Sequence, residues 1–188
     1  DQRKPCRDAS GSVISPIEVT LESGGGHLED GYKLGDVFRA KGVTTIIPDD
    51  KMCASSCAVA FLGGKKRVVA TKGSILFHAP YLKQMSIDGS VKINCESPEK
   101  ERQLLKNYYS RMTDDEVGAR LYERTMWYCS AEHGWTIKGG AAAEMYGIAH
   151  HKMASTVSSR KHICKRYVNG VPSLFPAISC PADTVRVR

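Results

Sequence analysis

The first part of the chain alternates between strand-like and helix-like patterns of apolar residues. Residues 17–21 alternate apolar and polar side chains, as a half-buried strand does. Residues 28–40 place apolar side chains at helical spacing, and residues 43–47 form a β-branched run. The order strand, helix, strand predicts a βαβ unit with parallel strands and a right-handed crossover.

A second apolar region follows a turn of small residues that ends at Ser56. The run Cys57 to Leu62 predicts a short helix that opens at Ser56. A glycine-rich basic turn then leads to two short strands, residues 68–70 and 74–77. The polar stretch 81–96 is expected to be a connection that leaves the sheet.

Two amphipathic helices are predicted between residues 97 and 128. Ser97 to Glu99 supply an N-cap, a proline at the first helical position and an acid in the first turn, for a helix that continues to Met112. Residues 113–116 read as a capping box, which opens a second helix through Tyr128.

The serine turn and His78 form a nucleophile-and-base pattern. A serine hydroxyl needs a base within hydrogen-bond reach, and that base comes from any distance along the chain. His78 directly follows a predicted strand. A helix that opens at Ser56 presents unpaired N–H groups to an oxyanion, and the glycines 24–26 allow close approach of a second backbone donor.

Four blocks of sequence, in this order, resemble the core blocks of the Clp protease/crotonase superfamily, and more closely its secreted, periplasmic ClpP-like serine proteases. The blocks are ESGGGHLEDG (22–31), CASSCAVAFLGGKKR (53–67), ILFHAP (75–80) and IKGGAAAEMYGI (137–148). The resemblance implies an α/β fold, the ClpP/crotonase-like fold of stacked βαβ units, over residues 17–150.

The resemblance also implies a role for each block. Its glycine block supplies oxyanion-hole donors, here Gly25 and Gly26. The nucleophile falls on Ser56, the backbone N–H of Cys57 becomes the other oxyanion donor, and the general base falls on His78. These roles describe a serine hydrolase, more narrowly a peptidase that attacks carbonyls of a peptide or protein substrate. The family's helices corresponding to residues 97–128 build subunit contacts, which implies a homo-oligomer.

Two features depart from the family pattern. Trp135 stands near the position expected for the triad aspartate, and Glu132 is the nearest substitute. The alternative is a dyad of Ser56 and His78 in which a backbone carbonyl holds the histidine. At the N-terminus, residues 1–16 are polar and irregular, whereas members of the family have a strand and a helix there. The N-terminal part of the family domain is therefore expected to be missing or altered.

Two further functions are compatible with the same blocks. One is a catalytically inactive ClpP-like binding or assembly protein of the cell envelope, in which Ser56 is only a turn residue. The other is a crotonase-like acyl-thioester enzyme, which uses the same oxyanion hole without a serine nucleophile. The sequence shows no nucleotide site that favours this last function.

Length and charge indicate one globular domain with a basic extension. The chain has 188 residues, of which 41% are hydrophobic, and its net charge is +7. The excess of basic residues lies near the C-terminus. We divide the chain into an irregular segment 1–16, a ClpP-like domain 17–150 and a basic C-terminal extension 151–188. No nucleic-acid motif or series of stacking aromatics accompanies these charges, and no apolar run reaches the ~18 residues of a transmembrane segment.

Seven cysteines in a chain of this size predict an oxidising compartment, and hence a periplasmic or secreted protein. Cys164 and Cys180 bracket a predicted loop, 169–176, and their disulfide would staple the extension. Cys53 and Cys57 either pair across the serine turn or each reach another partner.

The remaining cysteines and the histidines do not indicate a metal site. There is no pair of C-x-x-C steps, and no carboxylate or cysteine spacing completes a site around the histidines of the tail. We therefore expect no metal and no cofactor. An odd number of cysteines leaves at least one thiol free or intermolecular. The residues concerned are Cys6, Cys95, Cys129, His150, His151 and His162.

Overall fold

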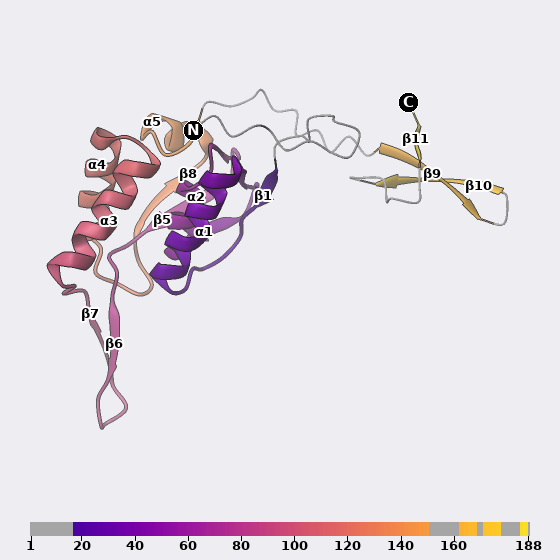
Figure 1. Cartoon of the computed structure of the whole chain (residues 1–188). Helices are drawn as coiled ribbons and strands as arrows, with labels where there is room; N and C mark the ends of the chain where they lie inside the picture. Colours follow the sequence, from indigo (N-terminus) through magenta and orange to yellow (C-terminus); the bar gives the residue numbers. More distant parts are fainter. Residues whose placement is uncertain (1–16, 151–161, 169–170, 178–184, 188) are drawn as a thin grey trace. The chain divides into compact units, whose positions relative to one another are not determined.

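The computed structural model describes residues 17–150 and, further along the chain, the backbone of three strands at 162–168, 171–177 and 185–187. The chain divides into two compact units, Asp1–His151 and Lys152–Arg188. Figure 1 shows the elements of each unit, and we describe the two units separately.

The first unit contains helices and strands in mixed order. Along the chain they are β1 (Glu18–Thr20), α1 (Leu28–Lys41), β2 (Thr44–Ile47), β3 (Met52–Ala54), α2 (Ser56–Leu62), β4 (Lys66–Val69), β5 (Ser74–Phe77), β6 (Leu82–Met85), β7 (Val91–Asn94), α3 (Glu99–Met112), α4 (Asp115–Met126), β8 (Trp135–Lys138) and α5 (Gly140–Met145). No helix in the described ranges combines the length and the apolar character that crossing a lipid bilayer requires.

The first sheet confirms the parallel strands of the predicted βαβ unit. β1 pairs with β2 in the register Glu18↔Thr44, and β2 pairs in parallel with β4. α1 connects β1 to β2 and stops at Gly42, whose φ of 68° is left-handed and whose N–H donates to Arg39 O at 3.2 Å. Glycine adopts this conformation without steric cost, so the chain can leave the helix and return to the sheet. α1 lies against α2 (Figure 1).

The second sheet is mixed, with β5 between a parallel neighbour, β3, and an antiparallel one, β8. The sequence pattern predicts β5 but neither of its neighbours. β3 is only three residues long, Met-Cys-Ala, and contains no β-branched side chain. β8 has one buried position among its four residues, so its apolar alternation is weak.

The polar connection 81–96 contains an antiparallel hairpin of β6 and β7, which the sequence pattern did not predict. Figure 1 shows this hairpin projecting from the helices and sheets of the first unit. All four residues of β6 are exposed, as are Ile87 in the turn and Val91 at the start of β7. β6, Leu-Lys-Gln-Met, does not alternate apolar and polar residues, and the alternation of β7, Val-Lys-Ile-Asn, spans only four residues, which explains why the pattern does not reveal the hairpin.

The helices α3 and α4 pack on each other, and each begins one residue later than predicted. The N-cap of α3 is Pro98, not Ser97. The N-cap of α4 is Asp114, whose Oδ1 accepts a hydrogen bond from Val117 N at 2.8 Å. The predicted cap Thr113 instead donates its hydroxyl to Tyr109 O at 2.7 Å, at the end of the preceding helix. The capping-box prediction was therefore wrong by one residue.

The substitution Asp114→Ala is expected to lower the free energy of unfolding by about 1 kcal/mol, because Val117 N loses its capping acceptor. Urea unfolding measures this change. The neighbouring Asp115→Ala serves as a matched control, since Asp115 is an exposed first-turn acid that interacts with the helix only through its charge, worth about 0.5 kcal/mol. Equal losses in both variants would contradict the assigned cap.

The core of the first unit contains one buried cation, Arg67 of β4, which is 4% exposed. Its guanidinium donates to the main-chain oxygens of Ile148 at 2.6 Å, Met112 at 2.8 Å and Leu62 at 3.3 Å. Burial lowers the pKa of Arg67 to about 10. The side chain therefore joins the ends of α2 and α3 to the segment that closes the unit after α5.

The second unit is a three-stranded antiparallel sheet in the order β10 (Val171–Ala177), β9 (His162–Val168) and β11 (Val185–Val187). The predicted loop 169–176 is mostly strand β10, so that prediction was wrong. The prolines at 172 and 176 suggested a loop, but β10 is an edge strand, where proline is tolerated. The predicted disulfide between Cys164 and Cys180, and the basic side chains of the extension, lie outside what the structure describes.

Candidate functional site

Three loops meet at the carboxyl ends of neighbouring strands. β3 and β5 are parallel, with Ala54 opposite Leu76, so the serine turn and His78 leave the sheet at the same edge. A parallel bridge pairs Ser23 with Cys53, which brings the start of the glycine block to this edge as well. The crevice beyond the carboxyl ends of parallel strands is where α/β folds commonly bind ligands.

The serine turn joins β3 to α2 in a single residue. Ser55 has φ 57° and ψ −127°, which lets the chain reverse from strand to helix without further loop residues. Ser55 N donates to Leu76 O at 2.9 Å, and Val59 N donates to Ser55 O at 3.1 Å. Ser56 is the first residue of α2 and is 9% exposed.

A disulfide between Cys53 and Cys57 spans this turn, with an S–S distance of 2.01 Å. Of the two pairings left open by the sequence, the one across the turn is therefore present. The bond ties the end of β3 to the first turn of α2, and the turn keeps both of its backbone hydrogen bonds. The disulfide therefore links the residue two positions before Ser55 to the residue two positions after it.

The glycine block packs directly against the serine turn. Gly25 has φ 102°, and a Cβ built on it would lie 2.6 Å from Ser55 Cβ, so no other residue fits there without displacing the serine. A Cβ built on Gly26 would lie 3.8 Å from Ser56 Oγ. Gly25 N donates to Ser23 Oγ at 3.1 Å. Gly25 would have to break that bond to bind an oxyanion.

The amides at the start of α2 are open donors. Val59 N makes the first hydrogen bond of this helix, to Ser55 O, so the N–H groups of Ser56, Cys57 and Ala58 have no acceptor within the helix. Among the described hydrogen bonds, none engages Gly26 N either. Two of the three predicted oxyanion donors, Gly26 and Cys57, are therefore unoccupied.

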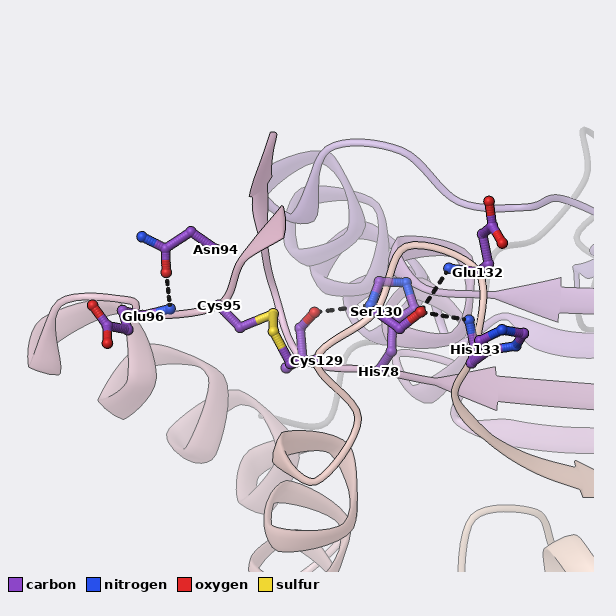
Figure 2. Close-up of a disulfide and its surroundings, with 9 residues drawn as sticks. His78, Asn94, Cys95, Glu96, Cys129, Ser130, Glu132 and His133 are labelled. Carbon is purple, nitrogen blue, oxygen red and sulfur yellow. Dashed lines mark hydrogen bonds between the residues drawn. A yellow bond between two sulfur atoms is a disulfide. The ribbon is translucent and has the colours of Figure 1, made fainter. Parts of the chain in front are cut away.

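His78 is held by its neighbour's backbone (Figure 2). Its Nδ1 lies 2.8 Å from Ala79 O, and because a carbonyl oxygen only accepts, Nδ1 carries the hydrogen and Nε2 is left as an acceptor. Ala79 N donates to Tyr128 O at 2.9 Å, which fixes this segment to the end of α4. The ring of Tyr81 lies beside the imidazole, with 5.4 Å between ring centroids. Neither Ser55 nor Ser56 makes a described hydrogen bond to His78.

Glu132 lies near this edge of the sheet, but its side chain makes no described interaction with His78. The turn that contains it is built on Ser130, whose Oγ accepts from Glu132 N at 3.1 Å and from His133 N at 3.0 Å. The Glu132 side chain is exposed, and Figure 2 shows its carboxylate pointing away from the His78 ring. In the described part of the chain no ion pair or hydrogen bond links Glu132 to His78. Of the other alternative, a dyad of Ser56 and His78, the structure contains the backbone carbonyl that holds the histidine but no described bond between the two residues.

Aromatic side chains pack around Trp135, near the position for which the sequence resemblance implies a triad acid. Trp135 at the start of β8 lies opposite Phe77 in the sheet, with 6.2 Å between their ring centroids. Its other neighbour is Tyr146, whose centroid is 4.9 Å away. Trp135 therefore has a packing role beside the segment that carries His78.

A second disulfide lies close to His78 (Figure 2). It joins Cys95, just after β7, to Cys129, just after α4, with an S–S distance of 2.04 Å. The bond fixes the hairpin to the turn that contains Ser130. The sequence did not reveal this pairing, because 34 residues separate the two cysteines and no local pattern joins them.

Among the residues that the structure describes, no group of histidines, cysteines and acids is arranged to hold a metal ion. His150 Nδ1 accepts a hydrogen bond from Arg67 N at 3.0 Å, which gives that histidine a structural contact. Burial lowers the pKa of His150. Cys6, His151 and the side chain of His162 fall outside the described ranges.

Comparison with known proteins identifies the fold. The structure of a serine-to-alanine mutant of 1510-N membrane-bound stomatin-specific protease is similar with a TM-score of 0.54, at 20% sequence identity, over 83% of this chain and 74% of that chain. A lysine-to-alanine mutant of that protease, in complex with a substrate peptide, is similar with a TM-score of 0.53, at 20% identity, over 85% and 72% of the two chains. The chain has a ClpP-like protease fold. No protein-family model matches the sequence, and no curated protein matches it either.

The ClpP-like fold agrees with the α/β class inferred from the four sequence blocks. At this level of identity the similarity concerns the fold, and the roles of individual residues depend on the geometry of the site itself.

Proposed function

We propose that this chain is a ClpP-like serine peptidase whose nucleophile comes from the serine turn and whose general base is His78. One observation carries the proposal: the serine turn and His78 leave adjacent parallel strands at the same edge, with His78 Nδ1 held by Ala79 O and Nε2 left to accept a proton. The fold, shared with a protease, supports the same activity.

In this proposal a serine hydroxyl attacks the peptide carbonyl while His78 Nε2 takes its proton. The sequence assigns this hydroxyl to Ser56. The tetrahedral oxyanion is held by open N–H groups of the glycine block and of the first turn of α2, those of Gly26 and Cys57. Collapse breaks the C–N bond, and the proton on His78 passes to the leaving amine. Water then hydrolyses the acyl-enzyme, with His78 again as base.

The substrate class and the setting follow from the same comparison and from the disulfides. One structure of the similar protease contains a substrate peptide, which supports a peptide or protein substrate here. Two disulfides within the described residues support an oxidising compartment, periplasmic or extracellular. We place a homo-oligomer contact on α3 and α4, because Leu104 of α3 and Trp127, directly after α4, are exposed apolar residues.

A non-catalytic binding or assembly protein with the same fold is the second candidate. It is favoured by the position of Glu132, whose carboxylate points away from His78, and by the lack of a described hydrogen bond between His78 and either serine. The first candidate requires only that this bond forms once a substrate is bound, as is common for catalytic hydrogen bonds.

Labelling with a fluorophosphonate probe separates the two candidates. The folded protein with intact disulfides is expected to bind one probe molecule covalently and to cleave unstructured peptides, with cleavage abolished by prior labelling. Protein unfolded in urea is the control and should remain unlabelled, because an unactivated serine does not react. Folded protein that neither labels nor cleaves any peptide of a diverse mixture would favour the non-catalytic candidate.

A further inference from the structure

We infer that Ser55, and not Ser56, is the nucleophile of this site. The inference rests on the proposed peptidase function and deepens it, because the two adjacent serines differ in backbone conformation, in exposure and in what surrounds their side chains. Each difference favours Ser55.

The backbone of Ser55 is strained in a way that a merely structural serine would not need. Among the described residues other than glycine, only Asp50 and Ser55 have positive φ. Asp50 lies in a polar turn, where aspartate commonly tolerates this conformation. Ser55 combines φ 57° with ψ −127°, a region that residues with a side chain rarely occupy. Such strain concentrates at catalytic positions.

The position of Ser55 between a strand and a helix is that of a nucleophile elbow. In this arrangement a sharp, strained turn carries the serine at its tip and exposes its hydroxyl above the sheet. β3 ends at Ala54 and α2 begins at Ser56, so Ser55 is the single residue of the turn. It is also partly exposed, whereas Ser56 is buried.

Ser56 is engaged in the contact between α1 and α2. A Cβ built on Gly31 of α1 would lie 2.7 Å from Ser56 O and 3.1 Å from Ser56 Cβ. Ser56 therefore packs closely against the first turn of α1, where a small residue is needed. This requirement gives the serine at position 56 a structural explanation.

Ser55 lies against the glycine block. Its Cβ and Oγ lie 2.6 Å and 3.1 Å from where a Cβ on Gly25 would be, so the backbone of the block approaches this hydroxyl closely only because residue 25 has no side chain, whereas Ser56 Oγ lies 3.8 Å from where a Cβ on Gly26 would be. In a nucleophile elbow the oxyanion donor is the N–H of the residue after the nucleophile. That donor is Ser56 N, which has no acceptor within α2. Ser56 then contributes its backbone rather than its hydroxyl.

The surroundings of the turn hold the strained conformation in place. The disulfide between Cys53 and Cys57 closes a five-residue ring around the turn, and Ser55 N and Ser55 O are both hydrogen-bonded to neighbouring elements. Strain persists only where the surrounding structure fixes it in this way.

The covalent step can be tested with the fluorophosphonate probe. Ser55 Oγ attacks phosphorus, the Oγ–P bond forms, the P–F bond breaks and fluoride leaves, while the hydroxyl proton passes to His78. Tandem mass spectrometry of the labelled native protein should find the adduct on Ser55. Labelling should fall by roughly 1000-fold or more in Ser55→Ala and should persist in Ser56→Ala.

The outcomes separate this inference from the proposed function. An adduct on Ser56, or labelling that survives in Ser55→Ala and disappears in Ser56→Ala, overturns the inference and leaves the peptidase proposal standing. Native protein that does not label overturns the peptidase proposal itself.

A stability measurement tests the strain without any activity. Ser55→Gly relieves the positive φ and should unfold at a higher temperature than Ser55→Ala, which retains it. At position 56 the order should reverse, because Ser56 lies in a helix where glycine is less favourable than alanine. A Ser55→Gly variant that unfolds below Ser55→Ala would contradict the strained elbow.

Discussion

The variant His78→Gln is expected to cleave peptides about 100- to 10,000-fold more slowly than the native protein. Glutamine keeps much of the size and polarity of histidine but cannot take a proton from the serine. The loss should appear mainly in kcat, since the histidine acts on the hydroxyl and not on substrate binding. Initial rates on a fluorogenic peptide, measured at several substrate concentrations, give both kinetic parameters.

His133→Gln is the matched control for this experiment. His133 lies in the turn next to the site, is exposed, and contributes a backbone N–H rather than its ring to Ser130 Oγ. The His133→Gln variant should cleave the peptide at the native rate and unfold at the native temperature. If His78→Gln retains activity, His78 is not the base.

The fold could be predicted wherever one face of an element is buried. The β-branched run of β2 reflects contact with the core, and in α1 Phe38 is buried although Leu34 and Val37 are exposed; both elements lie where the pattern places them. The hairpin of β6 and β7 has no such face, and β3 is too short to show a period. Their pairing depends on hydrogen bonds to distant strands, which no local pattern records.

The site could be predicted as a set of loops but not as a set of contacts. The order of the sequence blocks brings Ser56 and His78 to neighbouring strands, and the structure places them at one sheet edge. The direction of the Glu132 carboxylate depends on the turn around Ser130, and the bond to Ala79 O depends on the rotamer of His78. The positive φ of Ser55 is a property of the folded turn, because the sequence has no glycine there to signal it.

Replacing Arg67 by methionine is expected to lower the free energy of unfolding by about 3 kcal/mol or more. Methionine fills a similar volume but donates no hydrogen bond. The oxygens of Ile148 and Gly147 lose their described donor, while those of Met112 and Leu62 keep only the donors of Arg39. Removing a buried charge returns some stability, because burial opposes the charged form and lowers the pKa of Arg67 to about 10. The unpaired carbonyls outweigh this gain, since leaving each buried polar group unsatisfied costs about 1–3 kcal/mol.

Urea unfolding with the disulfides intact measures this loss, and two further variants define its origin. Arg67→Lys keeps the charge, but a single ammonium group cannot match the planar guanidinium that reaches four carbonyls, so it should also destabilise the protein. Lys65→Met changes an exposed cation two residues earlier and should alter stability by no more than about 0.5 kcal/mol. A stable Arg67→Met protein would mean that the ends of α2 and α3 and the closing segment hold together without their shared donor. Unchanged stability in Arg67→Lys alone would mean that charge, and not the geometry of the guanidinium, joins them.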